Sequence, residues 1–282
     1  MQLDRYDRSE QFLAAAGGFL QAREAEHNLI LGIAGSLAQD AGAYDGPPLL
    51  VTVTRHRHVV AAAIRTPPHN LIMSETDHPA AVAALADGIA GDDLPGLVGP
   101  PTVVRSFAER WATWHGRSWS VAREERIYRL TEVVPPRPGS GSPRLADAPD
   151  RDIVGRWLTD FGIEALDEHA ETGLIERALQ VWLRGNGRRF WLWEVDGRPV
   201  SMVGTSGRTP NGVRIGPVYT PPIERGRGFA SRLAAWVSQA MLDEGRRYCF
   251  LYTDLGNPTA NHIYQSIGYR PVTDALMVSF GT

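Results

Sequence analysis

Residues 213–237 read VRIGPVYTPPIERGRGFASRLAAWV, and this stretch decides how the rest of the chain is interpreted. The run from Val213 to Tyr219 has the composition of a short β-strand, and Pro221-Pro222 ends it because proline offers no N–H to a ladder. From Phe229 onward apolar residues recur at helical spacing, and Gly245 stands where a left-handed helix cap is expected. The stretch therefore predicts a strand, a glycine-containing turn and a helix.

The turn between that strand and helix has the features of a phosphate-binding loop. Gly226 and Gly228 lack Cβ atoms, so the backbone can turn sharply and anionic oxygens can approach its N–H groups. The N–H groups of the first helical turn have no intrahelical partner and together carry roughly half a positive charge. Arg225 and Arg227 add full positive charges. A pyrophosphate is the ligand expected at such a turn.

Two other kinds of phosphate loop fit this sequence less well. A Walker loop requires a lysine, whereas all 29 basic residues of the chain are arginine. The segment Gly226–Ser231 nearly matches the Gly-x-Gly-x-x-Gly loop of a dinucleotide-binding fold, with Asp254 ending the next strand. That loop should follow the first strand of a parallel sheet, however, and here it follows two expected hairpins. Too little chain remains after it to build the second half of a dinucleotide fold.

The loop and a second motif resemble the GNAT superfamily of acyl-CoA N-acyltransferases. The family's coenzyme A motif is Arg or Gln, two residues, Gly, one residue, and Gly or Ala, and the chain has Arg225-Gly-Arg-Gly-Phe-Ala230. The family also has Asn-x-x-Ala-x-x-x-Tyr before a Gly-aromatic pair, and the chain has Asn257-Pro-Thr-Ala-Asn-His-Ile-Tyr264 before Gly268-Tyr269. The resemblance covers residues 144–282. It implies an α/β protein with a mixed sheet and the GNAT fold in its C-terminal half.

The resemblance also implies the residues of the site. It implies that main-chain groups at Val218 and Thr220 hold the pantetheine and the acyl carbonyl, that Asn257 holds the pantetheine arm, and that Tyr264 protonates the departing sulfur. A residue of the apolar helix face is the alternative for Tyr264, and a solvated loop arginine is the alternative for Arg227. The residues expected to bind acetyl-CoA are Val218, Tyr219, Thr220, Arg225, Gly226, Arg227, Gly228, Phe229, Ala230, Ser231 and Asn257.

The reaction needs a route for the proton of the acceptor. An alkyl amine with a pKa of about 10.4 is protonated at neutral pH, so a base or a path of water molecules must take that proton. Asp254 is the first candidate because it ends the strand after the cofactor helix, although Asp at such a junction is also a common cap. Glu194 and Glu224 are further candidates, and a water relay stays open.

The acceptor is predicted from a cluster of acidic residues between the two helices of the second half. No Lys or Arg interrupts this cluster before Arg177, so its field would attract a small basic amine. A solvated acidic loop is the alternative. The cluster consists of Asp160, Glu164, Asp167, Glu168 and Glu171.

The predicted function is the transfer of an acetyl or short acyl group from acetyl-CoA to the primary amine of a small molecule, by direct attack in a ternary complex. Two alternatives stay open. One is an acyltransferase that uses aminoacyl-tRNA or a protein N-terminus, and the other is a sensor that binds acyl-CoA without catalysis. The net charge of −3 gives no chain-wide field for nucleic acid, which makes nucleic acid an unfavoured partner without excluding tRNA.

Composition bounds the remaining properties. With 282 residues, 43% of them hydrophobic, the chain can build two domains with their own cores. We find no signal-peptide pattern and no apolar segment long enough to cross a bilayer, so we expect a cytoplasmic protein and no membrane partner, and we leave a homodimer open. Cys249 lies in an alternating strand and is interpreted as a small hydrophobe. His56 and His58 lack a third ligand, so no metal is expected.

The N-terminal half is predicted to be a smaller, degenerate GNAT-like domain. Its expected order of helices and strands parallels that of the C-terminal half, but it has no Gly-x-Gly turn, so it should not bind coenzyme A. We place this domain at residues 1–133, a Pro/Gly/Ser-rich linker at 134–143 and the catalytic domain at 144–282. Asp196-Gly197 and Asn211-Gly212 predict two hairpin turns in the catalytic domain. The elements expected in the first domain are helices at Ser9–Ala16, Phe19–Leu37, Pro79–Ile89 and Val103–Trp114, and strands at Leu49–Thr54, Val59–Arg65, Leu71–Met73 and Trp119–Thr131.

Overall fold

The computed structural model describes residues 1–44, 46–166, 172–185 and 187–281. Within those residues, two halves of the chain show the same order of elements. The first half contains β1 (Gln2–Arg5), α1 (Ser9–Gln21), α2 (Asn28–Gln39), β2 (Leu49–Arg55), β3 (His58–Arg65), β4 (Leu71–Met73), α3 (Pro79–Gly88), β5 (Gly96–Gly99), α4 (Pro101–His115) and β6 (Trp119–Leu130).

The second half repeats this order with two short 3₁₀ turns added. It contains β7 (Ser142–Leu145), η1 (Ala148–Asp150), α5 (Arg151–Leu166), α6 (Thr172–Leu183), β8 (Arg189–Val195), β9 (Arg198–Ser206), β10 (Gly212–Tyr219), η2 (Pro222–Glu224), α7 (Phe229–Asp243), β11 (Tyr248–Asp254), α8 (Pro258–Ser266) and β12 (Arg270–Phe280). The repeated order supports the expectation that the first half is a degenerate copy of the second.

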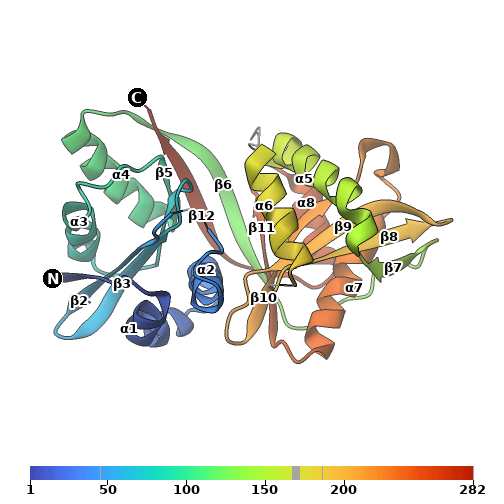
Figure 1. The fold of residues 1–282 in the computed structure, drawn as a ribbon, viewed down its shortest axis with the longest axis horizontal. Helices are drawn as coiled ribbons and strands as arrows, with labels where there is room; N and C mark the ends of the chain where they lie inside the picture. The colour runs from blue at the N-terminus through green and yellow to red at the C-terminus, as the bar shows by residue number, and fades with distance from the viewer. Residues whose placement is uncertain (45, 167–171, 186, 282) are drawn as a thin grey trace.

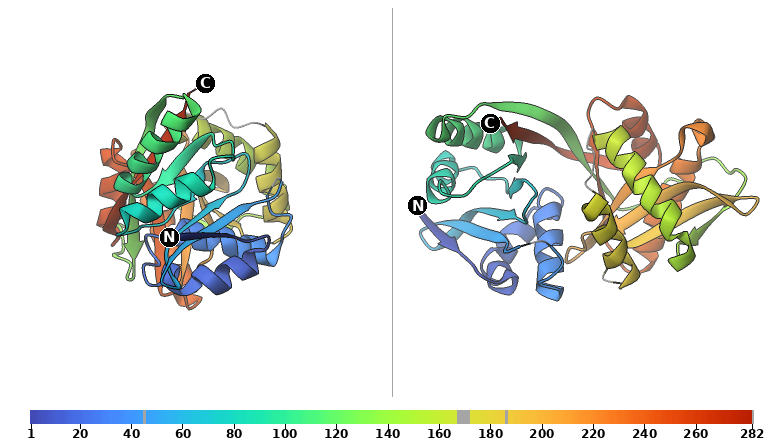
Figure 2. Two further views of the ribbon diagram at one scale, coloured as in Figure 1. Left: turned by 90° about the vertical axis from the view of Figure 1, so that its left-hand side faces the viewer. Right: turned by 45° about the horizontal axis from the view of Figure 1, so that its top comes forward.

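The two halves share one mixed sheet, and each gives its last strand to the other (Figure 1). The sheet has 12 strands among the described residues, in the order β1-β2-β3-β4-β5-β12-β6-β11-β10-β9-β8-β7. β12 therefore lies between β5 and β6, and β6 pairs with β11. Figure 2 shows the long strands β6 and β12 running between the halves. The domain boundary predicted after residue 133 separates the two halves along the chain. The sheet does not divide at that boundary, because β12 of the second half pairs with β5 and β6 of the first.

Four helices cover each face of this sheet within the described ranges. Because side chains alternate along a strand, Ile72 and Val98 pack under α1 and α2, while Leu71 and Leu97 pack under α3 and α4. The strand registers place α5 and α6 on the face of α1 and α2, and α7 and α8 on the face of α3 and α4. The site described below lies where the two halves meet on this sheet.

Most elements expected in the C-terminal half occur where the sequence signals place them. Asp196 and Gly197 both have positive φ, 51° and 72°, as the predicted type I′ turn requires. β9 and β10 are antiparallel, and β10 and β11 are parallel, so the sheet is mixed as expected. Cys249 is buried, and its thiol contacts the carbonyl of Ser238. Burial of Cys249 raises the pKa of its thiol to about 12, in keeping with the expected packing role.

The helix predicted from Phe19 to Leu37 is wrong. α1 continues to Gln21, and α2 begins only at Asn28. The intervening turn is held by buried His27, whose Nδ1 lies 3.1 Å from the carbonyl of Leu20 and whose Nε2 accepts from the N–H of Glu75 at 3.1 Å. These contacts reach a loop far along the chain, so local periodicity could not reveal them. The short strand β1 was not predicted.

Candidate active site

The loop from Arg225 to Gly228 has the geometry of an anion-binding turn. Gly226 and Gly228 both have φ of 75°, the left-handed conformation that favours glycine. Gly228 is the N-cap of α7, and no side chain caps this helix. Arg232 is the first residue whose N–H bonds back to the carbonyl of Gly228, at 3.2 Å. The N–H groups of the first turn therefore have no partner within the helix and are available to an anion.

The strands on either side of this loop separate as they approach it. β10 and β11 pair only over Gly212–Arg214 and Tyr248–Phe250. β10 then has a register shift between Ile215 and Val218 in its pairing with β9. Beyond Arg214 the edge of β10 that faces β11 has no ladder partner on that strand, so its main-chain groups can bind an extended ligand. Val218, Tyr219 and Thr220 lie on this part of the chain.

The two arginines predicted in the loop have carboxylate partners. The side chain of Arg225 forms an ion pair with Glu164, and its Nε donates to the carbonyl of Thr220 at 2.9 Å. The side chain of Arg227 forms an ion pair with Glu224. Both ion pairs are at least partly exposed, so a phosphate could compete for either guanidinium.

Arg232 is a further cation beside the loop that the sequence analysis missed. Its Nη2 donates to the carbonyl of Arg227 at 2.7 Å, and a Cβ placed on Gly228 would lie 3.0 Å from its Nη1. Burial lowers the pKa of Arg232, and no acidic side chain of the described residues offsets this effect. One helical turn separates Arg232 from Gly228, so helical spacing was the signal that could have identified it.

Part of the predicted acidic cluster lies within the described residues. The Oε1 of Glu164 accepts from the hydroxyl of Tyr219 at 2.9 Å, and hydrogen bonding to Arg225 lowers the pKa of Glu164. Burial is the main cause that raises the pKa of Tyr219 to about 12, and the hydrogen bond to Glu164 is the second. Glu164 therefore supports β10 and the loop. Asp167, Glu168 and Glu171 lie outside the described residues.

Tyr264 lies on α8 and packs against the same apolar core as Val218. Its ring meets that of Tyr269 edge to face, with centroids 6.0 Å apart. Burial raises the pKa of Tyr264 to about 12, so the hydroxyl stays protonated at neutral pH. Among the described residues the Tyr264 hydroxyl has no hydrogen-bond partner, which leaves it able to donate to a ligand.

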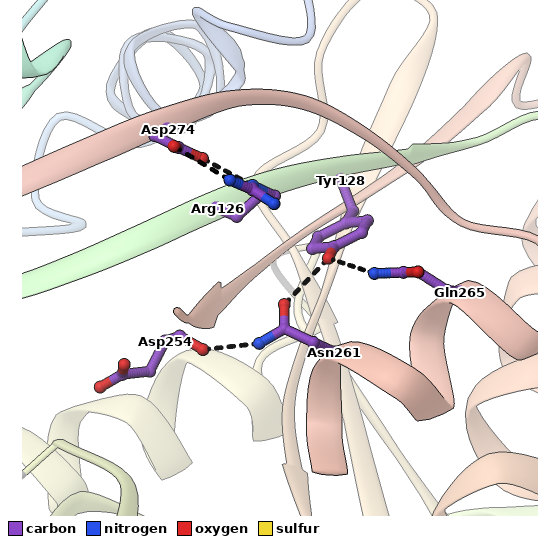
Figure 3. Close-up of polar contacts among 6 residues, drawn as sticks. All are labelled: Arg126, Tyr128, Asp254, Asn261, Gln265 and Asp274. Atoms are coloured by element: carbon purple, nitrogen blue, oxygen red, sulfur yellow. Dashed lines mark hydrogen bonds and ion pairs between the residues drawn. The ribbon is translucent and has the colours of Figure 1, made fainter. Parts of the chain in front are cut away.

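A polar network anchors α8 to the sheet (Figure 3). The hydroxyl of Tyr128 on β6 donates to Oδ1 of Asn261 at 2.9 Å and accepts from Nε2 of Gln265 at 2.9 Å. Asn261 also donates to the carbonyl of Asp254 at 2.8 Å. β6 comes from the first half of the chain, so the strand exchange positions the helix that carries Tyr264. No local sequence signal indicated this network.

The other predicted side chains have local partners. Oδ1 of Asn257 accepts from the N–H of Ala260 at 3.0 Å and so caps α8. Oδ1 of Asp254 accepts from the N–H of Gly256 at 2.5 Å, and Figure 3 shows the carboxylate turned away from Asn261. Glu194 forms an ion pair with Arg144 at 2.8 Å, between the edge strand β7 and its neighbour β8. Asp254 thus holds the turn between β11 and α8, whose cap is Asn257, and its role as a base stays a prediction.

A cavity of about 470 Å³ lies on the sheet face covered by α2, next to the point where β10 and β11 separate. Both halves of the chain line it, which is why the sequence pattern of neither half indicated it. Its lining residues include Leu29, Asn70, Glu125, Arg214, Tyr252 and Met277. Within the described ranges, no group of three or more His, Cys, Asp or Glu side chains could hold a metal ion. No helix there has both the length and the apolar character that crossing a lipid bilayer would require.

Comparison with known proteins identifies the family of a segment in the second half of the chain. Residues 153–269 match the model of the acetyltransferase (GNAT) family. A solved structure of a Drosophila protein has a TM-score of 0.72 at 12% identity and covers 99% of this chain and 98% of its own. A tandem GNAT protein from the clavulanic acid biosynthesis pathway, solved without AcCoA, has a TM-score of 0.57 at 15% identity and covers 99% and 98%.

An acetyltransferase of the GNAT family from Colwellia psychrerythraea has a TM-score of 0.54 at 9% identity, covering 99% of each chain. No curated protein matches the chain. The fold and the family match define the C-terminal half as a GNAT acetyltransferase domain. The chain as a whole has the two-domain GNAT layout, with a GNAT-like first half.

Proposed function

We propose that the protein is an acetyl-CoA-dependent N-acetyltransferase that acylates the primary amine of a small molecule by direct attack in a ternary complex. The observation that carries this proposal is the uncapped N-terminus of α7 beside the separated strands β10 and β11. A diphosphate would bind the amides of residues 228–231, with Arg225, Arg227 and Arg232 around it. The pantetheine arm would lie along Val218–Thr220, within reach of Asn257.

The reaction follows from the chemistry of a thioester. The neutral amine attacks the thioester carbonyl carbon, main-chain N–H groups of β10 stabilise the oxyanion, and the C–S bond then breaks. Tyr264 donates its proton to the departing sulfur and regains one from water. The proton of the ammonium leaves through Asp254, the first candidate among the bases that the sequence left open, or through water. A pH–rate profile of Asp254→Asn would distinguish them, because only the first route loses its base in this variant.

The test is release of free thiol from acetyl-CoA across classes of amine, with Tyr264→Phe as the variant. We expect at least one class of small amine to release thiol. Tyr264→Phe should lower kcat by about 100-fold, the usual contribution of a positioned acid, without weakening acetyl-CoA binding. Tyr6→Phe is a matched control, because the hydroxyl of Tyr6 contacts Thr52 in the first half.

Two results would contradict the proposal. If acetyl-CoA binds and no amine, peptide or tRNA releases thiol, the protein is a sensor of acyl-CoA. If thiol release requires tRNA and falls steeply with salt, the acceptor class is wrong.

A further inference from the structure

The cavity under α2 lies where an acyl group would arrive. A pantetheine arm that begins at the N-terminus of α7 and follows β10 backwards reaches the last paired residues, Arg214 and Phe250. The side chain of Arg214 lines the cavity, as does that of Tyr252, two residues past Phe250. Tyr264 packs with the core on the opposite face of the sheet. The separating ends of β10 and β11 therefore lie between a cavity on one face of the sheet and the predicted acid on the other.

Arg214 is a partly buried cation that forms no ion pair with a carboxylate of the described residues. Its Nη1 has no contact with solvent and no hydrogen-bond partner, and no carboxylate of the described residues forms an ion pair with it. A Cβ placed on Gly207 would lie 2.9 Å from its Nη2, so the β9–β10 turn holds the guanidinium closely. A guanidinium nitrogen kept out of water without a hydrogen-bond partner is costly. A ligand anion in the cavity would remove that cost.

The other residues that line the cavity indicate which further chemical groups the ligand carries. Leu29, Ile72 and Met277 give the cavity apolar walls, while Asn70 and Glu125 add polar groups. Glu125 also interacts with another part of the protein. A cavity with both a guanidinium and a carboxylate suits a small molecule that has an anionic group and an ammonium. A doubly charged phosphate would be repelled by Glu125.

We propose that this cavity binds the acceptor of the transfer, and that the acceptor is a small amine that also carries a carboxylate, which Arg214 binds. The planar guanidinium can donate two parallel N–H bonds to a carboxylate, which gives both affinity and orientation. This inference rests on the proposed acyl transfer. It replaces the purely basic amine suggested by the acidic cluster with an amphoteric one.

The first experiment measures binding, so that it does not depend on turnover. The full chain saturated with coenzyme A is titrated calorimetrically with a panel of α- and ω-amino acids, with the primary amide of each and with matching aminoalkyl phosphonates. We expect at least one amino acid to bind, and its amide and phosphonate to bind about tenfold more weakly or worse. Arg214→Gln should reduce the affinity for the amino acid to that for the amide and leave the amide unchanged.

Two control variants separate recognition from folding. Arg214→Lys keeps the charge but loses the paired donors, so it should recover only part of the affinity. Arg198→Gln makes the same substitution at the exposed β8–β9 turn, outside the cavity, and should change nothing. Melting temperatures of all variants are compared first. An Arg214→Gln protein that melts like the wild type and binds acid and amide as the wild type does would overturn the inference.

Other outcomes distinguish a failure of this inference from a failure of the proposed function. If no amino acid binds, if the amide or phosphonate binds as well as the acid, or if Arg214→Gln weakens all of them equally, the inference is wrong. If an amino acid binds as expected and no thiol is released from acetyl-CoA, the inference on the ligand holds and the proposed function fails. If thiol is released only with amines that lack a carboxylate, the proposed function holds and the inference fails.

Discussion

Replacing Glu24 with alanine should separate the first half of the chain from the turn that supports Arg214. Glu24 lies between α1 and α2 and is 8% exposed. Its carboxylate accepts from the hydroxyl of Thr209, from the N–H of Asn211 at 2.8 Å and from Nδ2 of Asn211 at 2.7 Å. All three donors belong to the β9–β10 turn of the second half. One carboxylate therefore joins the two halves at this point.

The magnitude follows from the number and burial of these bonds. A hydrogen bond to a charged group contributes about 1.5–3 kcal/mol, and breaking a buried charged contact costs about 3–5 kcal/mol. Asn211 is partly exposed, so water replaces some of the lost bonds. We expect Glu24→Ala to lower the free energy of unfolding by about 3 kcal/mol. For a chain of this size that corresponds to a Tm lower by about 6–12 °C.

The assay is thermal unfolding followed by calorimetry, with two comparison variants. Glu24→Gln keeps one acceptor oxygen and should fall between the wild type and Glu24→Ala. Glu10→Ala removes an exposed glutamate that forms an ion pair with neighbouring Arg8, and it should change the free energy by less than about 0.5 kcal/mol. A Glu24→Ala protein that melts within about 2 °C of Glu10→Ala would show that this contact does not hold the halves together.

Two further predictions concern a glycine and a buried acid. Gly226→Ala should lower the free energy of unfolding by about 1 kcal/mol, because a φ of 75° is strained for alanine, and should weaken acetyl-CoA binding in a titration. Gly18→Ala inside α1 should raise the free energy of unfolding by about 0.5–1 kcal/mol and leave binding unchanged. Equal affinities of the two variants for acetyl-CoA would contradict the role of the loop. Hydrogen bonding to Arg144 lowers the pKa of Asp150, so its stabilisation is present above the unfolded value of about 3.9 and is lost as the pH falls through the folded value. Asp150→Asn should therefore be less stable than the wild type in urea at neutral pH, with the difference shrinking in acid; a constant difference would exclude this linkage.

The sequence predicted the elements whose signals are local. The strand, glycine turn and helix around Gly226 and Gly228 occur as expected, and so does the hairpin at Asp196-Gly197. These features depend on backbone preferences of a few adjacent residues, so neighbouring sequence is enough to indicate them. The match of residues 153–269 to the acetyltransferase (GNAT) family confirms the family that the motifs suggested.

The features that the sequence did not predict depend on contacts between distant residues. β6 was expected as a strand, but hydrophobic periodicity cannot indicate which neighbour a strand will pair with, and β12 was not predicted at all. The same holds for the turn around His27, which is held by Glu75, and for the cavity, whose walls come from both halves. Arg214 lies in a strand already assigned from its apolar neighbours. Its position gave no sign that the guanidinium would be unpaired.

The exchange of β6 and β12 has a consequence for how the protein is made on the ribosome. β5 ends at Gly99, and its partner β12 begins at Arg270, so about 170 more residues must be synthesised before that edge can be paired. At about 5–20 residues per second, the delay is roughly 10–35 s. During that time the nascent chain presents an open strand edge that another nascent chain on the same messenger could occupy, which favours slow release or a chaperone that shields it.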